Sequence, residues 1–420
     1  MHHFHYTTDR LYCEDVAVEE VAESVGTPFY LYSYATLVQH FNAFDSSFSD
    51  VPHLTCFSVK SNSNLAILKL FACKGGGADI VSGGELYRCL AAGVKPEKIV
   101  YSGVGKKREE MARALDSGIL MFNVESGQEL AALAGIAEEK QARAGIAFRV
   151  NPDVDPRTHP YISTGLKENK FGIDIHEAPK WYRAAADLPG LEVVGVSCHI
   201  GSQLTEISPF IEALRKLKGL IERLREDGHS IRYLDLGGGL GITYDHENPP
   251  HPSQYARAIK DELGNCGLVL IFEPGRVIMG NAGVLITRVL YTKSTSDKSF
   301  VVVDAAMNDL MRPALYDSYH GMQPVQKTGR GKLEVDVVGP ICESGDFLAK
   351  KRLLPQMEQG DLLAVMSAGA YGFSMSSNYN SRPRVCEVMV KGAVHQVIRT
   401  RETYEDLVRG ETIPDFLRGS

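Results

Sequence analysis

Short apolar runs alternate with longer amphipathic segments between about residues 54 and 273. Runs that are apolar at almost every position are typical of parallel strands, which are buried on both faces. Eight strands are predicted in this way, at residues 55–59, 78–81, 99–102, 121–124, 146–150, 194–198, 233–236 and 269–272. Eight strand-then-helix units over roughly 220 residues favour a closed, TIM-like (β/α)8 barrel over an open sheet.

The segments between these strands carry helix signals. Helices are predicted at residues 64–73, 84–92, 126–139, 209–225 and 253–263. Side chains that can accept a hydrogen bond from the first helical N–H groups stand near four of these starts, and they are Asn64, Ser82, Ser126 and Ser253.

After about residue 280 the pattern changes to β-like alternation bounded by Gly, Pro and Asp. Strands are predicted at residues 284–291, 299–304, 332–338, 362–366 and 385–390. An early run at 29–32 either joins them or leads into the barrel. The predicted fold is therefore α/β, with a barrel at residues 34–280 and a mostly antiparallel β domain formed by residues 1–33 and 281–420.

Composition excludes several classes of protein. The net charge is −7 and no block of Lys and Arg stands out, which disfavours nucleic acid as a partner. No apolar run is long enough to cross a bilayer, and the start lacks the pattern of a signal peptide. The eight cysteines are scattered without a C-x-x-C pair, which indicates reduced thiols in the cytoplasm. The histidines at positions 2, 3 and 5 resemble a tag, and no metal site is expected.

Polar residues or glycines directly follow the predicted strands. In a (β/α)8 barrel the C-terminal strand ends and the loops after them form the active-site face. The residues at these positions are Lys60, Ser82, Gly103, Glu125, Asn151, His199, Gly237 and Glu273. Together they indicate a site, but they do not identify a reaction.

Two of these positions suggest covalent and phosphate chemistry. Partial burial at the barrel rim would favour the neutral amine of Lys60, which is the form that makes a Schiff base. The alternative is a surface lysine that begins the next loop. The glycine run at residues 236–241 would let backbone N–H groups approach a phosphate, and a tight turn is the alternative.

Other candidate residues suit the binding of a ring and a carboxylate. Glu273 could pair with a protonated pyridine nitrogen, and Arg276 could hold a substrate carboxylate, although the two could also form a plain ion pair. His199 could lie over a ring while Ser202 donates to a phosphate, although a lone histidine more often has a structural role. In the second domain, Cys342 stands beside two carboxylates, which suits a neutral thiol that delivers a proton, although a packed interior thiol is the alternative.

Longer motifs occur in an order that resembles the fold-type III pyridoxal-phosphate-dependent decarboxylases, and within them the diaminopimelate decarboxylases. The resemblance runs over nearly the whole chain, from Gly26-Thr27-Pro28 and Tyr30 to the region of Tyr371. Its other pieces are Asn151-Pro152, residues 158–165, Lys170-Phe171-Gly172, His199-Ile200-Gly201-Ser202, Glu273-Pro274-Gly275-Arg276 and residues 311–316. One departure is Phe57-Ser58-Val59-Lys60-Ser61-Asn62, where the family usually has a Tyr-Ala-Val-Lys-Ala-Asn-like run. The lysine and the asparagine are kept.

The resemblance implies a role for each matching residue. The Schiff-base lysine is Lys60, the ring-stacking histidine is His199, and the partner of the pyridine nitrogen is Glu273. The implied phosphate contacts are Ser202, Gly238, Gly275, Arg276 and Tyr371. The implied substrate contacts are Arg276, Arg312, Tyr316, Glu343 and Tyr371. The implied proton donor is Cys342, which in this family reaches the site from the partner subunit, so a head-to-tail homodimer with shared active sites is expected.

Three alternatives remain at this stage. Ornithine, arginine and carboxynorspermidine decarboxylases share the lysine, histidine and glycine motifs. Arg312 with Tyr316 suits a second substrate carboxylate, which favours meso-diaminopimelate over them. An alanine racemase would place an arginine where Glu273 stands. A non-catalytic, decarboxylase-like regulator would not need both Lys60 and Cys342.

Overall fold

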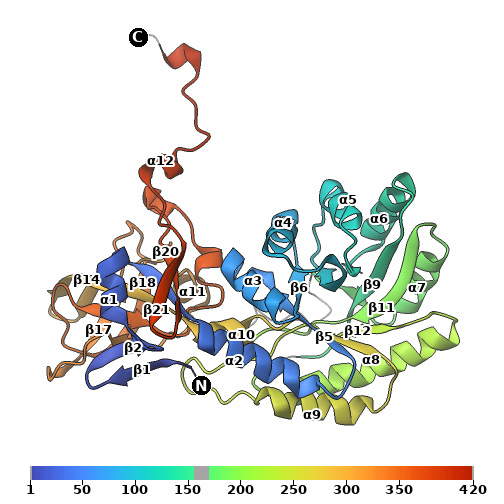
Figure 1. The fold of residues 1–420 in the computed structure, drawn as a ribbon, viewed down its shortest axis with the longest axis horizontal. Helices are drawn as coiled ribbons and strands as arrows, with labels where there is room; N and C mark the ends of the chain where they lie inside the picture. The colour runs from blue at the N-terminus through green and yellow to red at the C-terminus, as the bar shows by residue number, and fades with distance from the viewer. Residues whose placement is uncertain (1, 156–169, 419–420) are drawn as a thin grey trace. The chain divides into compact units, whose positions relative to one another are not determined.

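The computed structural model describes residues 2–155 and 170–418 of the chain. The chain divides into two compact units (Figure 1). One consists of Leu37–Gly280, and the other combines Met1–Thr36 with Asn281–Ser420. Among the described residues, no helix is both long and apolar enough to span a membrane.

The first unit contains a closed ring of parallel strands. In the part of the chain that the structure describes, the ring has eight strands, and β13 closes it by pairing with β5. In order around the ring they are β5 (His53–Ser58), β6 (Gly77–Ile80), β7 (Ile99–Tyr101), β8 (Met121–Val124), β9 (Ala144–Asn151), β11 (Leu191–Ser197), β12 (Tyr233–Asp235) and β13 (Val269–Phe272). A short strand, β10 (Ile173–Asp174), adds to β9. The predicted (β/α)8 barrel is therefore confirmed.

Helices connect successive strands of the ring, another helix precedes the first of these strands, and a short one follows the last (Figure 1). They are α2 (Tyr34–Asp45), α3 (Leu65–Cys73), α4 (Gly83–Ala92), α5 (Arg108–Asp116), α6 (Gly127–Glu139), α7 (Ala178–Ala186), α8 (Ser208–Glu226), α9 (Pro252–Leu263) and α10 (Arg276–Met279). The predicted caps Asn64, Ser82 and Ser126 each accept a hydrogen bond from a first-turn N–H group. The predicted cap Ser253 is wrong, because α9 begins at Pro252 and His251 supplies the acceptor.

The second unit is built on a mixed sheet that is mostly antiparallel. Its strand order is β18-β17-β15-β14-β4-β20-β21, and β19 and β16 extend from β14. The bounds are β4 (Phe29–Ser33), β14 (Gly283–Ser294), β15 (Ser299–Val303), β16 (Met322–Pro324), β17 (Lys332–Val338), β18 (Phe347–Pro355), β19 (Leu362–Val365), β20 (Cys386–Lys391) and β21 (Val394–Arg399). The early run at residues 29–32 joins this sheet as β4, between β14 and β20.

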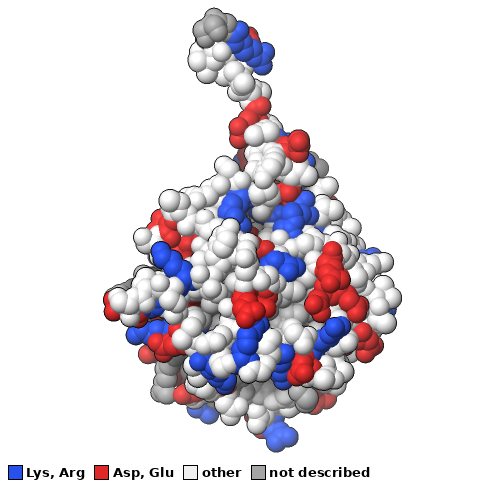
Figure 2. Space-filling model, turned by 90° about the vertical axis from the view of Figure 1, so that its left-hand side faces the viewer, with Lys and Arg blue, Asp and Glu red and all other residues white. Residues whose placement is uncertain are grey.

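Smaller elements complete the second unit. Strands β1 (Phe4–Thr7), β2 (Arg10–Cys13) and β3 (Val16–Ala17) form a separate antiparallel sheet. The helices are α1 (Val18–Val25), α11 (Arg312–Tyr316) and α12 (Tyr404–Leu407). The core of this unit packs the apolar faces of α1 and β2 against β4, β14 and β20. Acidic and basic side chains are mixed over the face drawn in Figure 2.

Candidate active site

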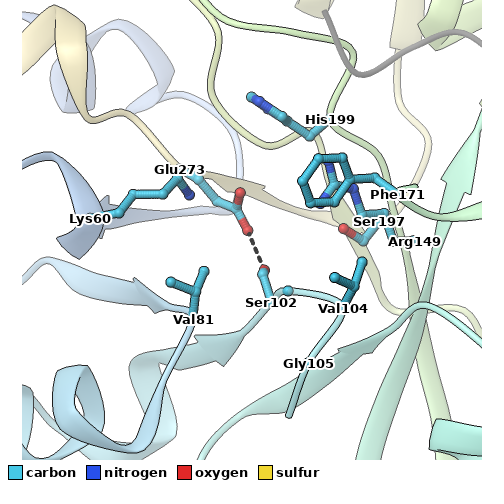
Figure 3. A pocket seen from close by; sticks show the side chains of 11 residues that line it. Lys60, Val81, Ser102, Val104, Gly105, Arg149, Phe171, Ser197, His199 and Glu273 are labelled. Carbon is cyan, nitrogen blue, oxygen red and sulfur yellow. Dashed lines mark hydrogen bonds between the residues drawn. The ribbon is translucent and has the colours of Figure 1, made fainter. Parts of the chain in front are cut away.

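A cavity of about 420 Å³ opens at the C-terminal ends of the barrel strands (Figure 3). Three of the predicted cofactor residues line it, namely Lys60, His199 and Glu273. The other lining residues are Val81, Ser102, Gly103, Val104, Gly105, Arg149, Phe171 and Ser197. These residues come from the ends of different strands and the loops after them, because parallel strands of a barrel all end on the same face.

Lys60 lies in the single turn of 3-10 helix η2 (Val59–Ser61), directly after β5. Its Nζ donates a hydrogen bond to Oδ2 of Asp79, over 2.7 Å. Asp79 is completely buried, and Ser58 Oγ donates to the same oxygen over 2.9 Å. Partial burial was expected to favour the neutral amine of Lys60. That expectation is wrong, because the Lys60 side chain is 40% exposed and its Nζ contacts a buried carboxylate.

Glu273 follows β13 and belongs to a buried network of carboxyl groups. It forms a side-chain hydrogen bond with Asp235, and Ser102 Oγ donates to it over 3.3 Å (Figure 3). Asp235 also accepts from the Gly237 N–H over 2.9 Å and from Asn123 Nδ2 over 2.8 Å. Both oxygens of Asp235 thus accept hydrogen bonds, which is the pattern of an ionised carboxylate.

The pKa values in this network follow from burial and from like charge. Burial, with the carboxylates of Asp235 and Asp79, raises the pKa of Glu273 well above its ordinary value. Burial also raises the pKa of Asp235, to about 6. Two carboxyl groups in contact do not both ionise readily, so Glu273 holds the proton of the pair near neutral pH.

His199 follows β11 and stays neutral. Burial lowers its pKa well below the ordinary value, and the positive charges of Arg149 and Lys60 act in the same direction. The Gly238 N–H donates to Nδ1 of the imidazole over 3.2 Å. Because Nδ1 is an acceptor, the neutral ring carries its hydrogen on Nε2.

The glycine run after β12 passes close to the strand end that carries Glu273. A Cβ on Gly238 would lie 2.3 Å from the carbonyl oxygen of Glu273, so only glycine fits there. Gly237 and Gly239 have φ of +62° and +115°, which glycine adopts without strain. The nearby Arg276 donates from Nη2 to Ser202 Oγ over 3.0 Å. The glycine run at residues 236–241, the glycine loop, therefore brings its backbone close to the end of β13. The Ser202 hydroxyl and the Arg276 guanidinium, both of which can donate to a phosphate, lie nearby.

Of the other predicted residues, Gly275 is in the barrel unit, where it is the N-cap of α10. The rest lie in the second unit, on three separate segments. Arg312 and Tyr316 are the first and last residues of α11, and the guanidinium carbon lies 5.9 Å from the tyrosine ring centre. Cys342 and Glu343 are exposed in the turn between β17 and β18, where the Cys342 N–H donates to Asn380 Oδ1 over 2.9 Å. Tyr371 follows β19 with φ of +56°.

Sequence reasoning missed several polar residues inside the barrel strands. Asp79, Asn123, Arg149 and Asp235 are all buried, and each stands next to an apolar residue in its strand. That contrast was the available signal, because a charged side chain is rarely buried unless it is paired. The motif at residues 158–165 lies outside the described residues.

Comparison with known proteins places the barrel unit in a family. Residues 34–280 match the model of the pyridoxal-dependent decarboxylase family, pyridoxal binding domain. The chain is 55% identical to diaminopimelate decarboxylase of Pseudomonas aeruginosa over 98% of this chain and 99% of that protein. It is 53% identical to the enzyme of the same name from Haemophilus influenzae, over 97% and 98% of the two chains.

A solved structure agrees with these matches. The crystal structure of diaminopimelate decarboxylase from Helicobacter pylori complexed with L-lysine has a TM-score of 0.90 and 45% identity, over 93% of this chain and 98% of that one. The match extends well beyond the barrel and therefore includes the β unit. The chain therefore belongs to the diaminopimelate decarboxylase family of pyridoxal-dependent decarboxylases.

Proposed function

We propose that this chain decarboxylates meso-2,6-diaminopimelate to L-lysine and CO2, the last step of lysine biosynthesis, with pyridoxal 5'-phosphate as its cofactor. The observation that carries the proposal is the convergence of Lys60, His199 and Glu273 on one cavity at the active-site face of the barrel. This is the residue set that an amine-linked, ring-shaped, phosphorylated cofactor requires. The family membership supports both the reaction and the cofactor.

The cavity residues fit this cofactor by their own chemistry. A protonated, buried Glu273 suits a ring nitrogen that must gain and keep a proton. A neutral His199 suits the face of a ring, because it adds no charge there. The phosphate would accept hydrogen bonds from N–H and O–H groups of the glycine loop and its neighbours. These residues are Gly238, Ser202, Gly275, Arg276 and Tyr371.

When bound, the cofactor supplies an electron sink for the bond to the departing CO2. The chain's own residues hold and move the protons. Lys60 would provide the amine that anchors the cofactor, with Asp79 orienting its Nζ. Glu273 would pass its proton to the ring nitrogen and remain beside it as an acceptor, while Asp235 helps to keep that proton on the nitrogen.

The substrate would be held by cationic and hydroxyl groups. Arg276 and Tyr371 would contact the end of the substrate that loses CO2. Arg312 with Tyr316 would bind the substrate carboxylate that is retained in the product. Glu343 would face an ammonium group of the substrate. Cys342 would deliver the proton that replaces CO2.

We also propose that Cys342 and Glu343 act on the site of a second copy of the chain, in a homodimer with shared active sites. Equal mixing of the inactive Lys60→Ala and Cys342→Ala chains tests this. In a mixed dimer one of the two sites has both residues intact, so about a quarter of the wild-type activity should return. No recovered activity after subunit exchange would mean that the proton donor acts within its own chain.

Release of CO2 tests the reaction and the substrate together. The purified protein with pyridoxal phosphate is offered meso-diaminopimelate, ornithine, arginine and lysine separately, with Lys60→Ala as the inactive control. CO2 and L-lysine from diaminopimelate alone are expected. Comparable turnover of ornithine, arginine or lysine would contradict the substrate assignment.

A further inference from the structure

We infer that His320 is a positioning residue for substrate recognition, because it fixes the direction in which the guanidinium of Arg312 points. The inference rests on the proposed function, in which Arg312 binds the carboxylate that does not leave. It adds a residue that neither contacts the substrate in that proposal nor belongs to the motifs of the sequence analysis. Every contact that carries it lies within the β unit.

The contacts of His320 define its protonation. The side chain is completely buried, and its Nδ1 lies 2.9 Å from the backbone carbonyl oxygen of Met366. A carbonyl oxygen only accepts, so Nδ1 carries the hydrogen. Nε2 of the neutral ring then presents a lone pair, and it accepts a hydrogen bond from Nε of Arg312 over 3.4 Å.

The imidazole is held by the sheet itself. The Met366 N–H donates to the carbonyl oxygen of Gly321 over 2.8 Å, directly beside His320. From there β16 pairs with β19, with Met322 opposite Val365. His320 and Met366 thus stand at the end of one antiparallel ladder, which positions the backbone that bears the imidazole and the carbonyl that anchors it.

This arrangement decides how Arg312 can act. A guanidinium presents its N–H donors in one plane, and two of them must meet the two oxygens of a carboxylate for bidentate binding. His320 binds Nε, and Ser318 Oγ accepts from Nη2 over 3.3 Å. Two anchored donors fix the plane of the other donors. Without His320 the long side chain of Arg312 would sample other rotamers, and the bidentate geometry would be populated less often.

Two substitutions separate the two nitrogen atoms of His320. In His320→Asn the amide nitrogen replaces Nδ1 and keeps the bond to Met366, but the acceptor for Arg312 is lost. In His320→Gln the amide oxygen can replace Nε2 as that acceptor. In the holoenzyme, His320→Asn should raise KM for meso-diaminopimelate by about tenfold and change kcat by less than about threefold, while His320→Gln should restore KM to within about threefold of wild type.

Binding of two ligands to the holoenzyme gives a readout that a purely structural role would not move. L-lysine keeps the carboxylate that Arg312 is proposed to bind, and 1,5-diaminopentane lacks it. His320→Asn should lower the affinity for L-lysine by about tenfold and leave the affinity for 1,5-diaminopentane unchanged. An equal loss of affinity for both ligands would overturn the inference. So would a His320→Gln variant whose KM for meso-diaminopimelate is as high as that of His320→Asn.

Control variants keep the outcomes distinct. His53→Asn changes another histidine whose Nδ1 contacts a backbone carbonyl, at 3.0 Å from Val51, but it lies at the start of β5, and it should leave KM unchanged. If His320 variants fail to fold, Ser318→Ala removes the other anchor and should raise KM by about threefold, and an unchanged KM would overturn the inference. If Arg312→Lys raises KM while His320→Asn does not, the inference fails and the proposed function stands. If Arg312→Lys changes neither KM nor the affinity for L-lysine, the proposed substrate recognition itself fails.

Discussion

The Nζ of Lys60 lies 2.7 Å from Oδ2 of Asp79, a buried carboxylate in the middle of strand β6. The two residues come from adjacent strands of the barrel, since β5 pairs with β6. The other oxygen of Asp79 is buried and has no hydrogen-bond partner among the described residues. The carboxylate therefore holds the amine through Oδ2, which it shares with the Ser58 hydroxyl, and so positions the Nζ of Lys60.

Replacing Asp79 should slow the reaction. Asp79→Asn keeps the volume but removes the charge that orients Nζ, so kcat should fall by about 10- to 100-fold. Steady-state kinetics on the cofactor-loaded protein measure this. Asp45→Asn is the matched control, since Asp45 pairs with His53 and Thr55 instead of Lys60, and it should leave kcat unchanged. A kcat within twofold of wild type in Asp79→Asn would remove Asp79 from the mechanism.

Alanine in place of Gly238 should distort the glycine loop at residues 236–241. Gly238→Ala places a Cβ 2.3 Å from the Glu273 carbonyl oxygen, so the backbone must move. We expect a loss of at least about 10-fold in affinity for pyridoxal phosphate, measured by absorbance titration.

Gly135→Ala is the control for Gly238→Ala. Gly135 is in α6 and its Cβ would meet nothing within 4 Å. Alanine there should raise the free energy of unfolding by about 0.5–1 kcal/mol without changing cofactor affinity. Unchanged cofactor affinity in Gly238→Ala would show that the loop does not hold the phosphate.

His199 should remain neutral well below the ordinary titration range of histidine. Because its pKa is lowered by burial, the imidazole should keep its hydrogen on Nε2 from pH 8 to pH 5. Nitrogen-15 NMR of labelled histidine reports both the tautomer and the charge. An imidazolium signal for His199 at pH 6 would contradict the assignment.

Glu85 should make the cofactor-free protein less stable as the pH rises. Its Oε2 accepts from the Val81 N–H over 2.7 Å, and burial raises its pKa to about 7. Between about pH 4.5 and 7 the folded state keeps a proton that the unfolded state has lost, so this group lowers the free energy of unfolding as the pH increases through that window. The expected loss from this group is roughly 1–3 kcal/mol.

Denaturant unfolding of wild type and Glu85→Gln at several pH values isolates this contribution. The difference in free energy of unfolding between the two proteins should change with pH from about 4.5 to about 7 and be constant above about 7. Glu110→Gln serves as the control, because hydrogen bonds from Gly83 and Lys107 lower the pKa of Glu110 despite partial burial. Its effect should appear only below about pH 4.5. A pH-independent difference for Glu85→Gln would refute the raised pKa.

Local sequence was enough to predict the barrel strands. The strand predicted at residues 269–272 matches β13 (Val269–Phe272), because a parallel strand buried on both faces is a continuous apolar run. Helix starts such as Asn64 were also predictable, since a cap acts on its own first turn. The edge strand β18 was missed, because its exposed lysines break the apolar pattern.

The candidate residues Lys60, His199 and Glu273 were visible in the sequence because each follows a predicted strand, and barrel topology brings strand ends together. Their charge states were not visible. The proton on Glu273 depends on burial and on Asp235, and the neutrality of His199 depends on its burial and on Arg149. The contact of Lys60 with Asp79 was not visible either. Sequence determined which groups reach the cavity, since strand ends follow from local patterns. Only the tertiary structure decided how they are charged, because burial and like charge act between residues far apart in the chain.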